Sequence, residues 1–178
     1  MIEVRETAIE GLLLFEPKVF HDNRGFFFES WRKNTYRKLG IDEELVQDDI
    51  SFSQKDVLRG LHVHMQQGQL LTILAGIVFD VVVDLRPQSK TYKQFLSFTL
   101  SGEKPQQIYM PPGTAHGFCV LSDSALLHYK CSQYYDPKAE SGIRWDDPTL
   151  AIPWPVKKPA LSERDQHFPP LSGTLLNG

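Results

Sequence analysis

Three of the six histidines have spacings that are typical of a chemical site. His62 and His64 are two residues apart in a segment with strand character, so both side chains point to the same side. Gln69 follows five residues later, and His116 comes after the turn at Pro112 and Gly113. Imidazole can ligate a metal or transfer a proton near neutral pH. The spacing therefore predicts a shared metal or proton-transfer site rather than unrelated core histidines.

The same residues match the two-part motif of the cupin superfamily. The motif is His-x-His, then an acid or amide, then Gly, and finally Pro-x-Gly-x-x-His. In metal-binding cupins the four side chains hold one ion, and the set here would be His62, His64, Gln69 and His116. A neutral amide replaces the usual acid at Gln69, which weakens a divalent site. The resemblance implies an all-β fold, the double-stranded β-helix or jelly-roll barrel, with a few short helices.

Short strands must position these residues. Runs of β-branched and aromatic residues alternate with Gly and Pro turn signals, which is typical of a sandwich or barrel. One helix is predicted at 31–39, before Gly40, and the Pro-rich segment 137–178 is expected to pack on the barrel as an extended tail. We expect a single domain spanning 1–178. The predicted strands are 11–15, 25–29, 70–74, 77–85, 94–100, 107–110, 118–121 and 125–135.

The segment 77–85 carries two acids on one face. With a period of two, Asp80, Val82 and Asp84 lie on one side of the strand and the apolar residues on the other. Two interpretations have equal weight: the acids line a polar cavity, or they lie on a solvated outer face.

Bulk properties exclude several classes of protein. The chain has 178 residues, a net charge of −3 and a sequence pI of about 6.1, so no basic nucleic-acid surface is expected. The longest apolar stretch, 73–83, is broken by Gly76 and Asp80, and no membrane association is expected. The acidic, mixed N-terminus does not resemble a secretory signal. Cys119 and Cys131 are expected to be reduced thiols in a cytoplasmic protein.

Beyond the histidines, the chain resembles the dTDP-4-dehydrorhamnose 3,5-epimerase family over about residues 9–165. In that family the C4 ketone of a nucleotide-linked sugar acidifies the hydrogens on C3 and C5. A base removes one proton to give an enolate, and an acid returns a proton to the opposite face. No cofactor is implied, and the partner is a dTDP-sugar substrate. The matching segments are 15–30, 46–48, 57–62, 76–86, 111–118, 129–130, 134–135 and 161–165.

The resemblance assigns roles residue by residue. His62 would be the base, oriented by Asp165 from the tail, and Tyr129 the acid on the far face of the sugar. Arg24 and Arg59 would hold the diphosphate, since a guanidinium fork fits phosphate oxygens. Further residues match polar or aromatic positions around the sugar and the nucleotide, with Tyr135 stacking on thymine: Phe20, Glu29, Gln47, Asp49, His64, Gln69, His116, Tyr135, Glu140 and Arg164.

Two departures from the family pattern lie close together. The family usually has Lys at the position of Gln69, where it supports the enolate oxygen, and Gln at the position of His64, with a longer loop between. The local sequence is instead similar to dTDP-4-keto-6-deoxyhexose 3,4-ketoisomerases, which are also cupins. We hypothesise that His64, protonated when substrate binds, replaces the missing lysine together with Gln69.

Several alternatives stay open. The leading interpretation is epimerisation at C3, and probably also C5, of a dTDP-4-keto-6-deoxyhexose. A ketoisomerase, a metal-binding cupin and a non-catalytic sugar-nucleotide binding protein are the rivals. The family resemblance implies a homodimer that shares a strand. Residues 1–10 would provide that strand, or would pair within their own barrel.

Overall fold

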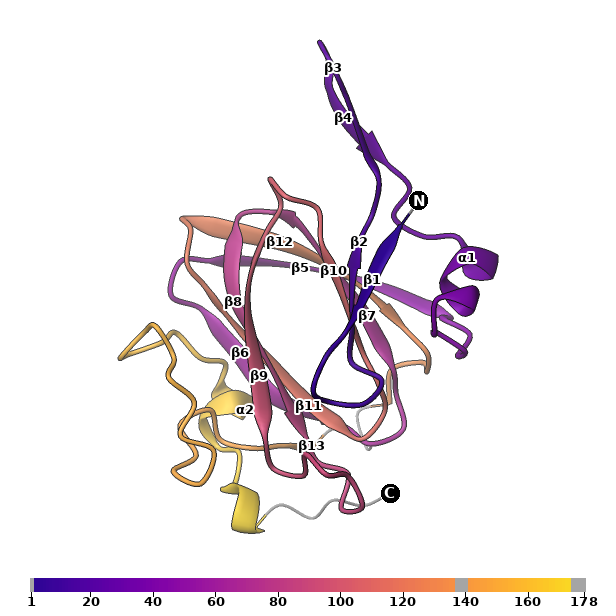
Figure 1. Cartoon of the computed structure of the whole chain (residues 1–178). Coiled ribbons are helices and arrows are strands. Elements are labelled where there is room, and N and C mark those ends of the chain that lie inside the picture. Colours follow the sequence, from indigo (N-terminus) through magenta and orange to yellow (C-terminus); the bar gives the residue numbers. More distant parts are fainter. Residues whose placement is uncertain (1, 137–140, 174–178) are drawn as a thin grey trace.

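Two antiparallel sheets face each other and form the barrel of this structure, a computed structural model that describes residues 2–136 and 141–173 (Figure 1). The first sheet has six strands, in the order β1 (Glu3–Glu6), β2 (Leu13–Glu16), β10 (Gln107–Met110), β7 (Gln69–Ala75), β12 (Ser124–Cys131) and β5 (Gln47–Gln54).

The second sheet has five strands, in the order β13 (Ser141–Gly142), β6 (Leu58–His64), β11 (Thr114–Val120), β8 (Ile77–Asp84) and β9 (Phe95–Ser101). A separate hairpin consists of β3 (Val19–Asp22) and β4 (Gly25–Phe28). The helical elements are short: α1 (Lys33–Lys38), α2 (Glu163–Gln166) and the 3₁₀ turn η1 (Leu171–Gly173). The predicted all-β barrel with a few short helices is confirmed.

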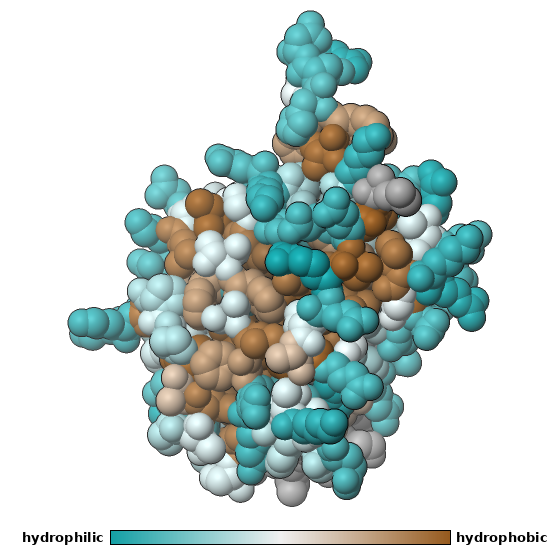
Figure 2. Space-filling model, in the orientation of Figure 1, coloured by the Kyte–Doolittle hydropathy of each residue, from teal (hydrophilic) through white to brown (hydrophobic). Residues whose placement is uncertain are grey.

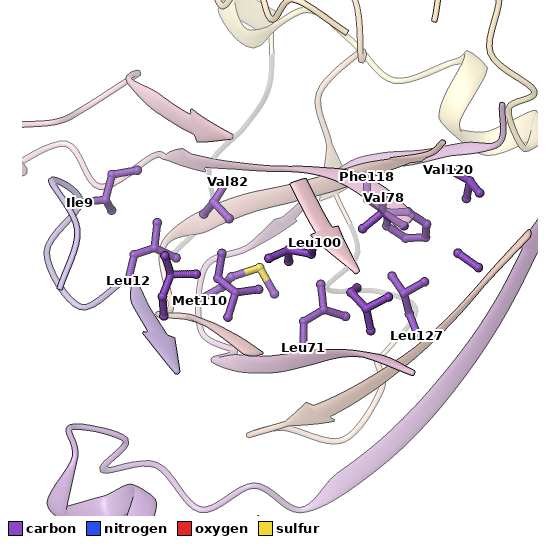
Figure 3. Packing of buried hydrophobic residues seen from close by; sticks show 14 residues of the cluster. Ile9, Leu12, Leu71, Val78, Val82, Leu100, Met110, Phe118, Val120 and Leu127 are labelled. Carbon is purple, nitrogen blue, oxygen red and sulfur yellow. The ribbon is translucent and has the colours of Figure 1, made fainter. Parts of the chain in front are cut away.

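The apolar core lies between the two sheets (Figure 3). Leu71 and Leu127 come from the first sheet, while Val82 and Phe118 come from the second, and all four are at most 1% exposed. Full burial of such a side chain stabilises the fold by about 1.5–3 kcal/mol. The core fills one part of the space between the sheets, and the polar residues described below fill another.

The two acids of β8 also point into the protein. Asp80 and Asp84 are both fully buried, so the solvated-face interpretation is wrong. Asp84 accepts hydrogen bonds from the guanidinium of Arg86 and from the hydroxyls of Ser89 and Thr91. A buried carboxylate requires such donors because burial without them is costly.

The C-terminal tail covers the outer face of the second sheet. Ile143, Leu150 and Leu171 from the tail form one apolar cluster with Leu61 of β6 and Val81 of β8. This packing places α2 against β6, so that a residue of the tail reaches the strand that carries His62. No helix in the described ranges is long and apolar enough to cross a membrane.

The β3–β4 hairpin projects from the barrel at the end opposite α2 (Figure 1). Three of its phenylalanines are exposed, with Phe20, Phe26 and Phe27 at 52%, 50% and 70%. Figure 2 shows a hydrophilic hairpin tip and hydrophobic side chains between the tip and the barrel. At the sheet edge, β1 pairs with β2 of the same chain, from Glu3 opposite Glu16 to Glu6 opposite Leu13.

Candidate active site

His62 and Asp165 form a hydrogen-bonded pair. The Nε2 atom of His62 lies 3.0 Å from Oδ1 of Asp165, whose side chain is only 2% exposed. Burial opposes ionisation of Asp165, but the bonds from His62, the Gly60 N–H and Ser162 prevail and lower its pKa. An ionised carboxylate only accepts, so it holds the proton on Nε2 of His62. The Nδ1 atom of the imidazole is left to act as a base.

The local backbone explains how Asp165 reaches the strand. Ser162 caps α2, and its Oγ accepts a hydrogen bond from the Asp165 N–H at 3.0 Å. On β6, Gly60 has φ +130°, and a Cβ there would lie 2.6 Å from the Cα of Gly117 on β11. Only glycine fits both the conformation and the close approach. The two strands can therefore place His62 directly opposite His116.

A second imidazole–carboxylate pair lies beside the first. The Nε2 atom of buried His116 is 2.7 Å from Oδ2 of Asp80, while Oδ1 of Asp80 has no hydrogen-bond partner among the described residues. The ring of His116 is 6.4 Å from that of Tyr129, which comes from β12 of the other sheet. Burial raises the pKa of the Tyr129 hydroxyl, so it holds its proton at neutral pH. The barrel interior around His62, His116 and Tyr129, called the cavity below, thus contains a base and a protonated phenol on facing sheets.

The structure does not favour the alternative in which His62, His64, Gln69 and His116 hold a metal ion. The Nε2 atoms of His62 and His116 both face carboxylates, Asp165 and Asp80. In the described ranges, no three His, Cys, Asp or Glu side chains are grouped so that they would hold a metal ion. The geometry favours proton transfer over metal binding.

The protonation state of His64 bears on the expected replacement of the lysine. Burial, followed by the neighbouring His116 and His62, lowers the pKa of His64 to about 3. The imidazole is therefore neutral near pH 7 in the protein without substrate, which does not favour the expected protonated His64 as the replacement for a lysine. Taking an imidazolium out of water beside two other imidazoles is unfavourable.

Gln69 begins a line of hydrogen-bonded polar residues that continues to Asp49 and Gln47. Its amide nitrogen donates to Oε1 of Gln67 at 2.7 Å and lies 3.7 Å from Sγ of Cys131. The Cys131 thiol lies 3.7 Å from Asp49, which also accepts from the amide of Gln47 at 2.8 Å. Of the predicted binding residues, the structure thus brings Gln69, Asp49 and Gln47 together.

The remaining predicted residues divide into two groups. Arg59 donates to Ser53 at 2.9 Å, and its charge acts on Tyr129, so it belongs to the cavity. The guanidinium of Arg164 lies 3.8 Å from Asp165. Tyr135 is 59% exposed, and its backbone N–H donates to Gln47 at 2.8 Å.

The other group is not brought to the cavity of the same chain. Phe20 and Arg24 lie on the projecting hairpin, where Arg24 is 84% exposed and pairs with Asp22. Glu29 follows the hairpin and pairs with Arg32. Glu140 lies outside the described residues.

Sequence reasoning missed three contributors to this site. Asp80 was only assigned to one face of the segment 77–85. Its position in the period of two was the signal that could have made it a candidate partner of His116. Ser162 begins a Ser-x-x-Asp pattern that is typical of a helix N-terminus and predicts the cap. Gln67 gave no signal, because its role depends on the conformation of a loop.

Fold and site together define a cupin-type isomerase built around proton transfer. Comparison with known proteins gives the family: residues 6–173 match the model of dTDP-4-dehydrorhamnose 3,5-epimerase. The chain belongs to this family. It is 45% identical to the enzyme of that name from Salmonella typhimurium, with 99% of each chain covered. It is 38% identical to a dTDP-4-dehydrorhamnose 3-epimerase from Streptomyces niveus, covering 93% of this chain and 82% of that one.

Solved structures of similar proteins support the same family. The epimerase from Legionella pneumophila, solved in complex with dTDP-4-keto-L-rhamnose, has a TM-score of 0.93 and 45% identity. The alignment covers 99% of this chain and 95% of that one. A 4-keto-6-deoxy sugar epimerase from Streptomyces spheroides has a TM-score of 0.92 and 37% identity, covering 97% and 88%. These matches confirm the predicted cupin fold.

Proposed function

We propose that this protein epimerises a dTDP-4-keto-6-deoxyhexose at C3 and C5. The observation that carries the proposal is the pairing of ionised Asp165 with His62 on one sheet, with protonated Tyr129 on the facing sheet. Inversion of a carbon requires a base and an acid on opposite faces of the sugar ring. The family membership adds the substrate class, since relatives are named for this reaction.

Proton transfer would follow from the protonation states of the site. Nδ1 of His62 accepts the proton from C3, and the C–H electron pair moves into the enolate with its charge on the C4 oxygen. Tyr129 returns a proton to the opposite face, and solvent restores both residues. Asp165 stabilises the imidazolium that forms and stays ionised throughout.

Proton NMR of dTDP-4-keto-6-deoxyglucose with the protein in D₂O tests the proposal. We expect loss of the H3 and H5 signals, each reporting one deprotonation. Loss of H3 alone would make the protein a 3-epimerase. If dTDP binds tightly but neither signal decays, the protein is a binding module and the proposal is wrong.

A 3,4-ketoisomerase is the second candidate, and Gln69 is the observation that favours it. Its amide is neutral, and the neighbouring His64 is neutral as well, so the C4 oxygen would meet no lysine-like cation at this position. A ketoisomerase moves the carbonyl from C4 to C3. Carbon-13 NMR of labelled substrate separates the two reactions, because epimerisation leaves the carbonyl at C4.

We propose that the protein forms a homodimer. Exposed aromatic residues of the hairpin and exposed Ile50 and Phe52 of β5 offer apolar surface, while Arg24 has no site in its own chain. In a homodimer the hairpin of one copy would supply Arg24 to the diphosphate bound by the other. Phe27→Asp should give a monomer in light scattering and weaken dTDP binding, and a dimeric variant would contradict this.

The compartment is proposed to be the cytoplasm. Cys119 and Cys131 are both free and buried, which fits a reducing environment.

A further inference from the structure

Two glutamines connect the cavity to an exposed aromatic segment, Gln133–Tyr135. The side chain of Gln67 donates from Nε2 to the carbonyl of Gln133 at 3.1 Å and accepts at Oε1 from Gln69 at 2.7 Å. Gln47 accepts at Oε1 from the Tyr135 N–H and donates from Nε2 to Asp49, both at 2.8 Å. Each glutamine therefore holds the backbone of the segment with one end of its amide and a cavity residue with the other.

The segment carries side chains that are open to solvent. Tyr134 and Tyr135 are 73% and 59% exposed, and they follow β12, which supplies Tyr129 and Cys131 to the cavity. Two hydrogen bonds hold the start of the segment, because the Gly68 N–H donates to Oγ of Ser132 at 2.8 Å and the Ser132 N–H donates to the Gly68 carbonyl at 2.9 Å. Beyond Ser132, Gln67 and Gln47 hold the chain on either side of the aromatic pair.

Gln67 holds the amide of Gln69 in a defined orientation by accepting a hydrogen bond from it at 2.7 Å. A primary amide has two donors, and one is used by Gln67. The other is directed to the Cys131 sulfur, a weak acceptor at 3.7 Å. Burial is the first cause that raises the pKa of Cys131 to about 12, so the sulfur is a thiol and not a competing anion. A substrate oxygen can replace this contact without breaking the bond to Gln67.

We propose that Gln67 is a positioning residue that orients Gln69 toward the sugar and anchors the aromatic segment against the nucleotide. This inference rests on the proposed function, because it assumes a dTDP-sugar with its oxygen at Gln69 and its base at Tyr135. Gln67 itself touches neither reacting atom. Its two roles use different atoms of one amide, so substitutions can separate them.

Gln67→Glu and Gln67→Leu separate the roles. The carboxylate of Gln67→Glu still accepts from Gln69 but cannot donate to Gln133, whereas Gln67→Leu loses both bonds. We expect the dTDP Kd, measured by calorimetry, to rise about tenfold in both variants, the size of one lost hydrogen bond. The rate of H3 exchange at saturating substrate should fall about tenfold in Gln67→Leu alone.

Gln66→Glu is the matched control. Gln66 is the exposed neighbour, so this variant adds the same charge without touching the two bonds. A Kd for Gln66→Glu as high as that of Gln67→Glu would mean that charge repels the diphosphate, which overturns the anchoring role. Equal rate loss in Gln67→Glu and Gln67→Leu, or no rate loss in either, overturns the orienting role.

The two proposals fail in distinguishable ways. Wild-type protein without any H3 exchange would contradict the proposed function, while the dTDP titrations would still test the anchoring role. If Gln67→Leu does not fold, as judged by its melting transition, Gln67→Glu and Gln66→Glu decide the outcome: Gln67→Glu must lose affinity and keep its exchange rate.

Discussion

The imidazole of His62 and the carboxylate of Asp165 meet at 3.0 Å although 103 positions separate them in the chain. The strand brings the base, and the tail that packs on the outer face of the sheet brings the group that orients it. Loss of tail packing should therefore reduce catalysis by displacing Asp165, even though the tail lies outside the barrel.

Asp165→Asn should lower the exchange rate at C3 by about 10²–10⁴, because an amide does not stabilise the imidazolium and favours neither tautomer. His62→Asn should lower the exchange rate at C3 by at least the same factor. Both variants should bind dTDP with nearly the wild-type Kd, since Arg59 and Tyr135 are unchanged. The measurement is H3 decay in D₂O beside a dTDP titration, and ordinary exchange in the His62 variant would remove the proposed base.

Tyr129→Phe should separate proton exchange from inversion. The hydroxyl is the proposed proton source on the second face, and burial keeps it protonated. Exchange at C3 should persist, because His62 and Asp165 are intact, while inversion at C3 and at C5 should be lost, because both need a proton from Tyr129. Product analysis by NMR checks this. Continued C5 inversion in the variant would assign the acid to another group.

The sequence predicts which side chains share one face of a strand, but it does not predict which of these faces is buried. Alternation places Asp80 and Asp84 on one face of β8, and the His-x-His spacing places His62 and His64 on one face of β6. Both follow from the period of a strand. Whether that face is buried depends on the opposite sheet. The burial of Asp80 and Asp84 could therefore not be predicted from their own strand.

His64 and Arg24 show where sequence reasoning fails. The pKa of His64 depends on its burial and on two other imidazoles, and none of these is a local property of the chain. Arg24 lies in the turn between β3 and β4, but the direction in which the hairpin leaves the barrel is set by packing. The family resemblance assigned Arg24 to a site, and the fold of one chain does not bring it there.

Asp84→Asn should destabilise the protein by about 1–3 kcal/mol at pH 7, because three side chains lose a charged acceptor. The pKa of Asp84 lies well below its usual value: burial opposes this, and the bonds from Arg86, Ser89 and Thr91 outweigh it. A carboxyl with a depressed folded-state pKa stabilises the fold above its unfolded pKa of about 3.9. That contribution is lost as pH falls from there toward the folded-state pKa.

The variant lacks this contribution at every pH, so its unfolding free energy should fall less steeply below about pH 4 than that of wild type. Asp146→Asn is the control, since Asp146 pairs with Arg144 at the surface and is 42% exposed. That change should cost about 1 kcal/mol or less. Urea unfolding between pH 7 and 3 measures both. If the unfolding free energies of wild type and Asp84→Asn fall equally steeply with decreasing pH, Asp84 does not supply the proposed pH-dependent stabilisation.

His64 should remain neutral across the pH range in which free histidine titrates. Its folded-state pKa is about 3, against about 6.5 in the unfolded chain. Between these values the unfolded chain binds a proton that the folded protein does not, so stability falls as pH drops below about 6.5. His64→Gln should reduce that loss between pH 7 and 5. An NMR signal of His64 that titrates near pH 6.5 would show that it can be the cation we first expected.

Gln69 is left as the candidate donor to the enolate oxygen at this position, and its substitution tests that role. An enolate in a partly dry cavity needs a hydrogen bond or a positive charge, and loss of one such donor costs about 10²–10³ in rate. Gln69→Leu should therefore lower kcat by about 10²-fold with little change in the dTDP Kd. Gln69→Lys supplies a charge and should keep or raise the epimerase rate. Gln66→Leu, at an exposed neighbour, controls for changes in the loop. Full activity in Gln69→Leu would show that another group stabilises the enolate, and a carbonyl that moves to C3 in wild type would identify ketoisomerisation instead.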